Sequence, residues 1–196
     1  MKIKLLAATL GLAVATQSSA TVLFADDFQT NLAQWSTNLS GVIVAAPVGT
    51  GNALAFTSPG SGGDLFQAGT ISSLHGNFTL TFDYLGTCGT SSCGGFIGFN
   101  NPAETWLAGS GYYPTPHPLL ETGAWQTVSL SFASASPIKL KLEDFVAASD
   151  GGATQNAYFR NLSVSGSVPE PASWALLITG FALTGLTARR RSAVTA

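Results

Sequence analysis

Charged and chemically reactive side chains are scarce in this sequence. Lys, Arg, Asp and Glu make up 9% of the 196 residues, and there are only two histidines, two cysteines and one methionine. Acid–base catalysis needs titratable groups in a cleft, and a zinc site needs several cysteine or histidine ligands. No Gly-x-Ser-x-Gly elbow, His-Glu-x-x-His motif, phosphate-binding loop or EF-hand loop occurs. These absences argue against an enzyme.

Basic residues are rare outside the two ends of the chain. Residues 21–166 contain three cations and nine anions, which gives this segment a formal charge of −6. A protein that binds nucleic acid needs a basic surface to neutralise phosphates. The charge balance therefore argues against a nucleic-acid partner.

The N-terminus has the pattern of a secretory signal peptide. Lys2 and Lys4 precede an apolar run over residues 5–15, and the small residues Ser18 and Ala20 occupy the positions that a signal peptidase reads. The apolar run is too short for a membrane anchor. We therefore expect residues 1–20 to be removed, with cleavage after Ala20, and the protein to be exported.

The two cysteines lie close together, at Cys88 and Cys93. An exported chain meets oxidising conditions, which favours a disulfide that closes a short loop. The alternative is a metal site, which would need further ligands, and the two histidines, His75 and His117, are distant in sequence. We expect the disulfide.

The C-terminal segment combines prolines, an apolar run and a basic cluster. Residues 171–188 carry no charge and would span about 27 Å as a helix, close to the thickness of a bilayer core. Pro169 and Pro171 disfavour a helix upstream, so a transmembrane helix is expected over about 172–188. Arg189, Arg190 and Arg191 follow directly and predict a cytoplasmic C-terminus.

The order of these features resembles the PEP-CTERM sorting signal of Gram-negative, exopolysaccharide-producing bacteria. Val-Pro-Glu-Pro at 168–171, a short spacer, the apolar run and the arginine cluster make up residues 167–196. The resemblance implies that an exosortase removes the tail near Pro169, Glu170 and Pro171, after a transient stay in the inner membrane. It also implies delivery to the cell surface or the extracellular polysaccharide matrix.

Residues 21–166 have the size of one domain and the pattern of an all-β fold. Residues 77–84 alternate strictly, with Phe78, Leu80, Phe82 and Tyr84 on one face. Two later strands, 125–132 and 137–145, point Val128, Leu130 and Phe132, and Ile138, Leu140 and Leu142, inward. The second of these strands is expected to turn Lys139, Lys141 and Glu143 to water.

Five weaker strands are expected at 22–24, 42–46, 53–56, 96–99 and 158–165, the last with a bulge near Arg160 or Asn161. About eight short strands separated by turn residues predict a jelly-roll-like β-sandwich. The body is also similar to galactose-binding-like and carbohydrate-binding-module-like sandwiches. The matching residues are Asp26-Asp27-Phe28, Trp35, the stretch 123–128 around Trp125, and the closing 158–164.

That similarity implies a structural calcium ion that joins the first and last strands. Asp26, Asp27 and Asn161 are the candidate ligands, with Asp144 or Asp150 nearby. The alternative is that these side chains are simply solvated loop residues.

A glycan-binding surface is the second candidate site. Residues 104–118 concentrate Trp106, Tyr112 and Tyr113 with three prolines, and we expect them to form a long loop. Its aromatic rings could stack on sugar rings, or they could pack beneath the loop. The two interpretations are left open at this point.

These patterns predict an exported, non-enzymatic surface or matrix protein that is sorted by its C-terminal segment and that either binds glycan or serves as a structural component. One alternative is a secreted hydrolase that acts on polysaccharide, for which the adjacent carboxylate pairs Asp26–Asp27 and Glu143–Asp144 are the candidates. Neighbouring strand residues point to opposite faces, which suits shared acid–base work poorly. The other alternative is a permanently anchored membrane protein whose tail is retained.

Overall fold

The computed structural model describes residues 20–36, 40–57, 65–72, 76–88, 93–101, 103–110, 115–146, 156–167 and 178–181. Among these residues, eleven strands are formed: β1 (Ala20–Asp26), β2 (Gly41–Ala45), β3 (Asn52–Phe56), β4 (Leu65–Phe66), β5 (Asn77–Gly86), β6 (Cys93–Asn101), β7 (Ala103–Ser110), β8 (His117–Leu119), β9 (Gln126–Ala133), β10 (Lys139–Val146) and β11 (Ala157–Ser167). They belong to one compact unit, Ala20–Val168.

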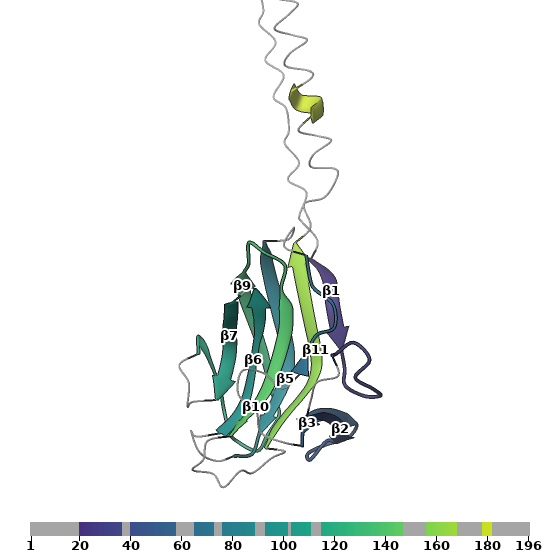
Figure 1. Cartoon of the computed structure of the whole chain (residues 1–196), viewed down its shortest axis with the longest axis vertical. Coiled ribbons are helices and arrows are strands. Elements are labelled where there is room, and N and C mark those ends of the chain that lie inside the picture. Colours follow the sequence, from purple (N-terminus) through teal and green to yellow (C-terminus); the bar gives the residue numbers. More distant parts are fainter. Residues whose placement is uncertain are drawn as a thin grey trace, which may run out of the picture. The chain divides into compact units, whose positions relative to one another are not determined.

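The strands form two sheets (Figure 1). The six-stranded sheet has the order β2-β3-β11-β5-β9, and β1 also pairs with β11; the five-stranded sheet has the order β4-β10-β6-β7-β8. Every pairing is antiparallel except that between β7 and β8. The predicted all-β, jelly-roll-like sandwich is confirmed.

The core lies between the sheets and follows the predicted alternation. On β5, the side chains of Phe78, Leu80, Phe82 and Tyr84 are all buried. Phe132 of β9 stacks on Phe78 of its own sheet and on Phe99 of the other sheet, each with ring centroids 5.2 Å apart. Each of these four buried side chains of β5 stabilises the fold by roughly 1.5–3 kcal/mol relative to an exposed position.

The last strand lies in the middle of its sheet. Figure 1 shows β11 between β1 and β5, as their pairing requires. Its register against β5 shifts between Arg160 and Ser163, which confirms the predicted bulge. The bulge restores the inward phase, so that Phe159 before it and Leu162 after it are both buried.

The expected long loop over residues 104–118 is wrong in two places. Residues 103–110 form β7, and residues 117–119 form β8. Alternation failed to reveal β7 because its pairing with β6 slips between Ile97 and Gly98, and because Ala108 and Gly109 add little apolar signal. The two-residue β4 is another strand that the pattern did not predict.

The prediction that Lys141 and Glu143 face water is also wrong. Ile138, Leu140 and Leu142 are buried as expected, but Lys141 and Glu143 are 0% and 3% exposed. The alternation itself is correct, because both charged residues lie on the face of β10 that is turned away from the core. On that outer face the Trp106 ring packs over Lys141, and Phe96 contacts both Trp106 and Phe145.

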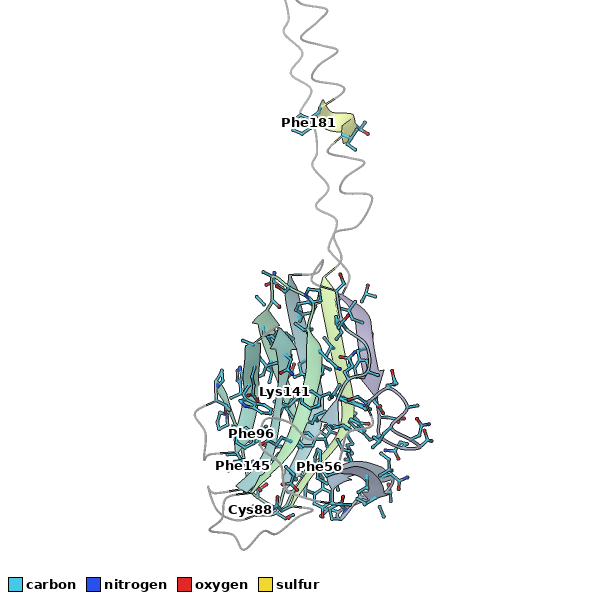
Figure 2. All side chains as sticks on the ribbon, viewed as in Figure 1. Phe56, Cys88, Phe96, Lys141, Phe145 and Phe181 are labelled. Carbon is cyan, nitrogen blue, oxygen red and sulfur yellow. The ribbon has the colours of Figure 1, made fainter. Side chains whose placement is uncertain are left out.

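Only residues 178–181 of the C-terminal segment are described, as a short helix with Phe181 exposed (Figure 2). Among the described residues no helix has the length and apolarity needed to cross a membrane. The rest of the helix expected over about 172–188 lies outside the described residues, as do Pro169–Pro171 and Arg189–Arg191.

Candidate functional site

Four adjacent strands of the five-stranded sheet contribute one residue each to a row on its outer face. Phe66 of β4 lies opposite Lys141 of β10, Lys141 lies opposite Gly98 of β6, and Gly98 lies opposite Trp106 of β7. Gly98 has no side chain, so the lysine side chain extends across β6 to the indole ring. Its ammonium nitrogen lies 3.6 Å from the centroid of the Trp106 ring.

Trp106 is held in place by neighbours on two strands. Phe96 of β6 contacts its ring edge-on, with centroids 5.5 Å apart, and Phe96 in turn contacts Phe145 of β10 at 5.8 Å. Figure 2 shows Lys141, Phe96 and Phe145 gathered on one side of the sandwich. Trp106 itself remains partly exposed. The indole therefore has a fixed orientation on a rigid strand.

Charges surround this aromatic group. Lys141 forms an ion pair with Glu104, whose side chain is 45% exposed although the lysine is fully buried. Glu143 is buried on the same face, opposite Phe96. Burial lowers the pKa of Lys141, and the two glutamates oppose that effect by favouring the charged ammonium. A cation with nearby carboxylates thus lies beneath an aromatic ring.

This arrangement has the chemistry of a sugar-binding surface. An indole offers a flat apolar surface to the C–H groups of a sugar ring, and an exposed carboxylate accepts hydrogen bonds from hydroxyls. Of the three aromatic residues predicted for this role, the structure places Trp106 here. Tyr112 and Tyr113 lie outside the described residues. Phe96, Lys141 and Glu104 were not predicted to take part, because only the pairing of β6, β7 and β10 brings them to Trp106.

Two of the three candidate calcium ligands, Asp26 and Asp27, already accept hydrogen bonds. Asp26, the last residue of β1, accepts hydrogen bonds from the Phe28 amide at 2.8 Å and the Trp35 indole at 2.7 Å. Asp27 accepts one from the Gln29 amide. Asp26 and Asp27 contribute to the lining of a surface cavity of about 370 Å³, whereas Asn161 does not.

Nothing in the described part of the chain assembles three or more His, Cys, Asp or Glu side chains into a group able to hold a metal ion. Of the two further candidates, Asp144 is fully buried on β10 and Asp150 lies outside the described residues. The calcium ion stays a prediction.

A second polar site, which the sequence did not reveal, lies at one end of the core. The Tyr84 hydroxyl donates to Glu121 Oε1 at 2.5 Å and accepts from the Gly95 amide at 2.8 Å. The Cys88 amide donates to Glu121 Oε2 at 3.1 Å. Burial raises the pKa of Glu121, and the hydrogen bonds from Tyr84 and Cys88 oppose that shift. Tyr84 thereby links β5 of one sheet to β6 of the other.

The predicted disulfide falls at this end of the sandwich. No free cysteine is found among the described residues, and Cys88 precedes a segment outside them. The side chain of Cys93 is not described, so its pairing with Cys88 stays a prediction.

Comparison with solved structures finds similar domains at low identity. The CBM22-1 xylan-binding domain of Xyn10C from Paenibacillus barcinonensis is 10% identical, with 79% of this chain and all of that domain covered, at a TM-score of 0.48. The carbohydrate-binding module CBM6cm-2 of Cellvibrio mixtus lichenase 5A, solved with cellotriose, is 9% identical, with 75% and 99% covered, at 0.42. The K3 cleaved adhesin domain of Lys-gingipain from Porphyromonas gingivalis is 14% identical, with the same coverage and TM-score. No family model and no curated protein matches the sequence.

Proposed function

We propose that the protein is an exported, non-catalytic glycan-binding domain that is sorted to the cell surface or the extracellular polysaccharide through its C-terminal segment. The observation that carries the binding role is Trp106, a partly exposed indole held by Lys141 and Phe96 on the outer face of a sheet. An aromatic ring that only fills the core would point between the sheets. Trp106 points away from the core and lies beside the exposed carboxylate of Glu104.

A neutral glycan fits this surface better than a polyanion. The body carries a formal charge of −6 over residues 21–166, and Lys141, the cation that contacts Trp106, is fully buried and paired. Acidic polysaccharides would be repelled at low ionic strength. Tyr112 and Tyr113, which lie outside the described residues, stay candidates for contact with the glycan.

Binding is tested with the exported body and soluble xylan and dextran as neutral probes, with polygalacturonate as the charged comparison. Trp106→Ala should reduce retardation of the protein in gels containing a neutral polysaccharide by about 10-fold, the loss of an aromatic contact worth about 1.4 kcal/mol. Because Trp106 packs against Phe96 and Lys141, this variant also loses stability, so retardation is measured well below its melting temperature.

Two further proteins complete that experiment. Trp106→Phe keeps most of the packing and should bind with intermediate affinity. Leu120→Ala removes an exposed apolar side chain elsewhere, 55% exposed in the structure, and should bind as the wild type does. Unchanged retardation of a folded Trp106→Ala protein would exclude the proposed site. Release of reducing sugar ends from the probes would instead support the hydrolase.

The proposed sorting route is supported by where the fold ends. The last strand, β11, ends at Ser167, and its final pair joins Ser167 to Ala20. The Pro169-Glu170-Pro171 motif therefore follows the last paired residue among those described, and cleavage there by an exosortase would leave every described strand in the mature protein. Intact-mass analysis of the mature protein from its native host should find residues 1–20 and the segment after about Pro171 missing. Mature chains that still end at Ala196 would contradict the route and favour a permanent anchor.

A further inference from the structure

A second group of polar and aromatic side chains lies on the opposite side of the sandwich, on the outer face of the six-stranded sheet. Its centre is Asp83 of β5. Asp83 Oδ1 accepts from the Thr127 hydroxyl at 2.7 Å, and Asp83 Oδ2 accepts from Asn161 Nδ2 at 2.8 Å and from Arg160 Nε at 3.3 Å. Three adjacent strands, β9, β5 and β11, thus contribute to one network.

The bulge in β11 produces this arrangement. Consecutive residues on a regular strand point to opposite faces, yet Arg160 and Asn161 both reach the same oxygen of Asp83. The register shift that follows Arg160 and the positive φ of Asn161, 52°, allow both side chains to share one face. Asn161 is one of two non-glycine residues with positive φ among those the structure describes. Such backbone conformations are concentrated at functional sites.

Trp125 fixes the guanidinium from below. Arg160 Cζ lies 4.0 Å from the centroid of the indole ring, and the indole N–H donates to the Val48 carbonyl at 2.8 Å. The guanidinium is therefore held by the ring and by its Nε, while 22% of the side chain stays exposed. Within the described part of the chain, neither the terminal nitrogens of Arg160 nor Oδ1 of Asn161 forms a hydrogen bond.

We propose that Arg160 and Asn161 form a second sugar-binding site, which takes two neighbouring hydroxyls of a neutral glycan. The guanidinium presents two N–H donors in a fixed plane, and the amide oxygen of Asn161 is an acceptor beside it. One sugar hydroxyl accepts from the arginine while its neighbour donates to the amide. Asp83 neutralises the arginine charge, so the site favours a diol over a carboxylate. Asp83 and Trp125 are positioning residues.

A purely structural ion pair would use the guanidinium differently. Arginine usually pairs with a carboxylate through two parallel N–H groups, which consumes the fork. Here Arg160 donates to Asp83 through Nε alone, and Thr127 and Asn161 supply the other hydrogen bonds to the carboxylate. The terminal nitrogens remain as donors on a side chain that is 22% exposed.

Two sites on opposite faces would let one molecule bridge two glycan chains. This consequence rests on the proposed function of Trp106, whereas the site at Arg160 does not. The two are separated by testing Arg160 in a protein that already lacks Trp106.

The experiment compares Trp106→Ala with the double variant Trp106→Ala/Arg160→Lys in gels containing xylan, dextran or galactomannan. Lysine keeps the charge but loses the planar fork. The single variant should still be retarded by at least one of these polysaccharides. Retardation of the double variant by that polysaccharide should be weaker by about 10-fold or more. Thr79→Ala in the same background changes a hydroxyl on the same face of β5 and should have no effect. Circular dichroism melts of each protein confirm that it is folded.

A chemically modified probe tests the diol. Periodate cleaves the carbon–carbon bond between neighbouring hydroxyl-bearing carbons to give two aldehydes, and borohydride reduces these to alcohols, so the polysaccharide stays neutral but loses its neighbouring hydroxyl pairs. This treatment should abolish the retardation that depends on Arg160. The proposal is overturned if folded Trp106→Ala binds none of the probes, if Arg160→Lys changes nothing, or if the oxidised probe binds equally well. Equal retardation of wild type and Trp106→Ala, with loss on Arg160→Lys, would reject Trp106 and retain Arg160.

Discussion

At the scale of single residues, Glu121 is a polar group that connects several segments at one end of the apolar core. The carboxylate of Glu121 lies so close to Gly86 and Gly94 that a Cβ at either glycine would overlap it. Glu121 also receives hydrogen bonds from Tyr84 and the Cys88 amide. One side chain thus joins the end of β5, the start of β6 and the segment after Leu119.

Glu121 should make stability depend on pH. Burial raises its pKa above the ordinary 4.5, so the folded protein binds the proton more tightly than the unfolded chain. Its contribution is complete below about pH 4.5 and is lost as the pH rises through the folded-state pKa. The difference in unfolding free energy between wild type and Glu121→Gln should therefore shrink as the pH is raised, as measured by urea unfolding at several pH values. A constant or growing difference would contradict this.

Asp83 provides a control of opposite sign. Burial raises its pKa, but the hydrogen bonds from Thr127, Asn161 and Arg160 outweigh burial and lower the pKa below the ordinary 3.8. Its contribution is present above that value and is lost as the pH falls through the folded-state pKa. The stability difference between wild type and Asp83→Asn should grow as the pH is raised towards the ordinary pKa of 3.8, below the range in which the Glu121 contribution changes.

The Lys141–Glu104 pair should respond unequally to removal of either partner. Lys141 is fully buried, whereas Glu104 is 45% exposed and can be hydrated alone. Glu104→Gln leaves a buried ammonium with a weaker partner and should cost about 2 kcal/mol or more. Lys141→Met replaces the lysine stem with an apolar chain that still packs on Trp106, and should cost no more than about 1 kcal/mol. Guanidinium unfolding measures both, and the reverse order would refute the assignment.

At the scale of elements, β6 is built to let other strands approach closely. A Cβ at Gly95 would lie 2.5 Å from the Tyr84 ring and 2.7 Å from the Phe159 ring. A Cβ at Gly98 would overlap the Thr105 carbonyl oxygen and lie 2.9 Å from the Trp106 Cα. The first glycine makes room for the core, and the second makes room for the irregular pairing with β7.

Gly98→Ala should therefore damage both stability and glycan binding. The atoms that its Cβ meets belong to the backbone of β7 and cannot rotate away, so the strands must separate at a cost of about 1–3 kcal/mol. The displacement moves Trp106 away from Lys141. Gly69→Ala is the matched control, since no atom lies within 4 Å of its Cβ and its φ is not in the left-handed region. Melting temperature and xylan retardation are measured on both, and equal behaviour would refute the role of Gly98.

At the scale of the whole molecule, the order of strands makes the body depend on its last segment. β11 is the final strand in sequence but pairs with β1, β3 and β5 in the sheet. Its side chains Phe159, Leu162 and Val164 are buried in the core. The sheet is therefore incomplete until residues up to Ser167 are available.

Truncations test this dependence. A chain of residues 21–168 keeps every strand pair except the one made by Ala20, so its melting temperature should match that of the full body within about 2 °C. A chain that ends at Asn161 loses Leu162 and Val164 and the pairing with β1, and should not unfold cooperatively. A stable 21–161 fragment would show that β11 is dispensable.

Local patterns in the sequence were sufficient for the regular parts of this fold. Strict alternation predicted the inward face of β5 and of β9, and the phase change after Phe159 predicted the bulge in β11. These features depend on side chains two residues apart on one strand, so neighbours in sequence determine them. The pattern did not predict β7 because its pairing with β6 slips between Ile97 and Gly98, and because Ala108 and Gly109 add little apolar signal.

The residues that surround Trp106 and Arg160 are brought together only by the tertiary structure. The types and rarity of the residues pointed to Trp106 and to an export and sorting route, but not to the partners that hold the indole. Trp106 and Lys141 are 35 positions apart in the sequence, and the lysine reaches the ring only because Gly98 lies between them in the sheet. Asp83 and Arg160 are likewise distant in sequence and lie opposite each other only because β5 pairs with β11, and Arg160 in turn contacts Trp125. Pairing of distant strands depends on which register buries the most apolar surface in the complete sandwich, and that balance exists only once both sheets have formed.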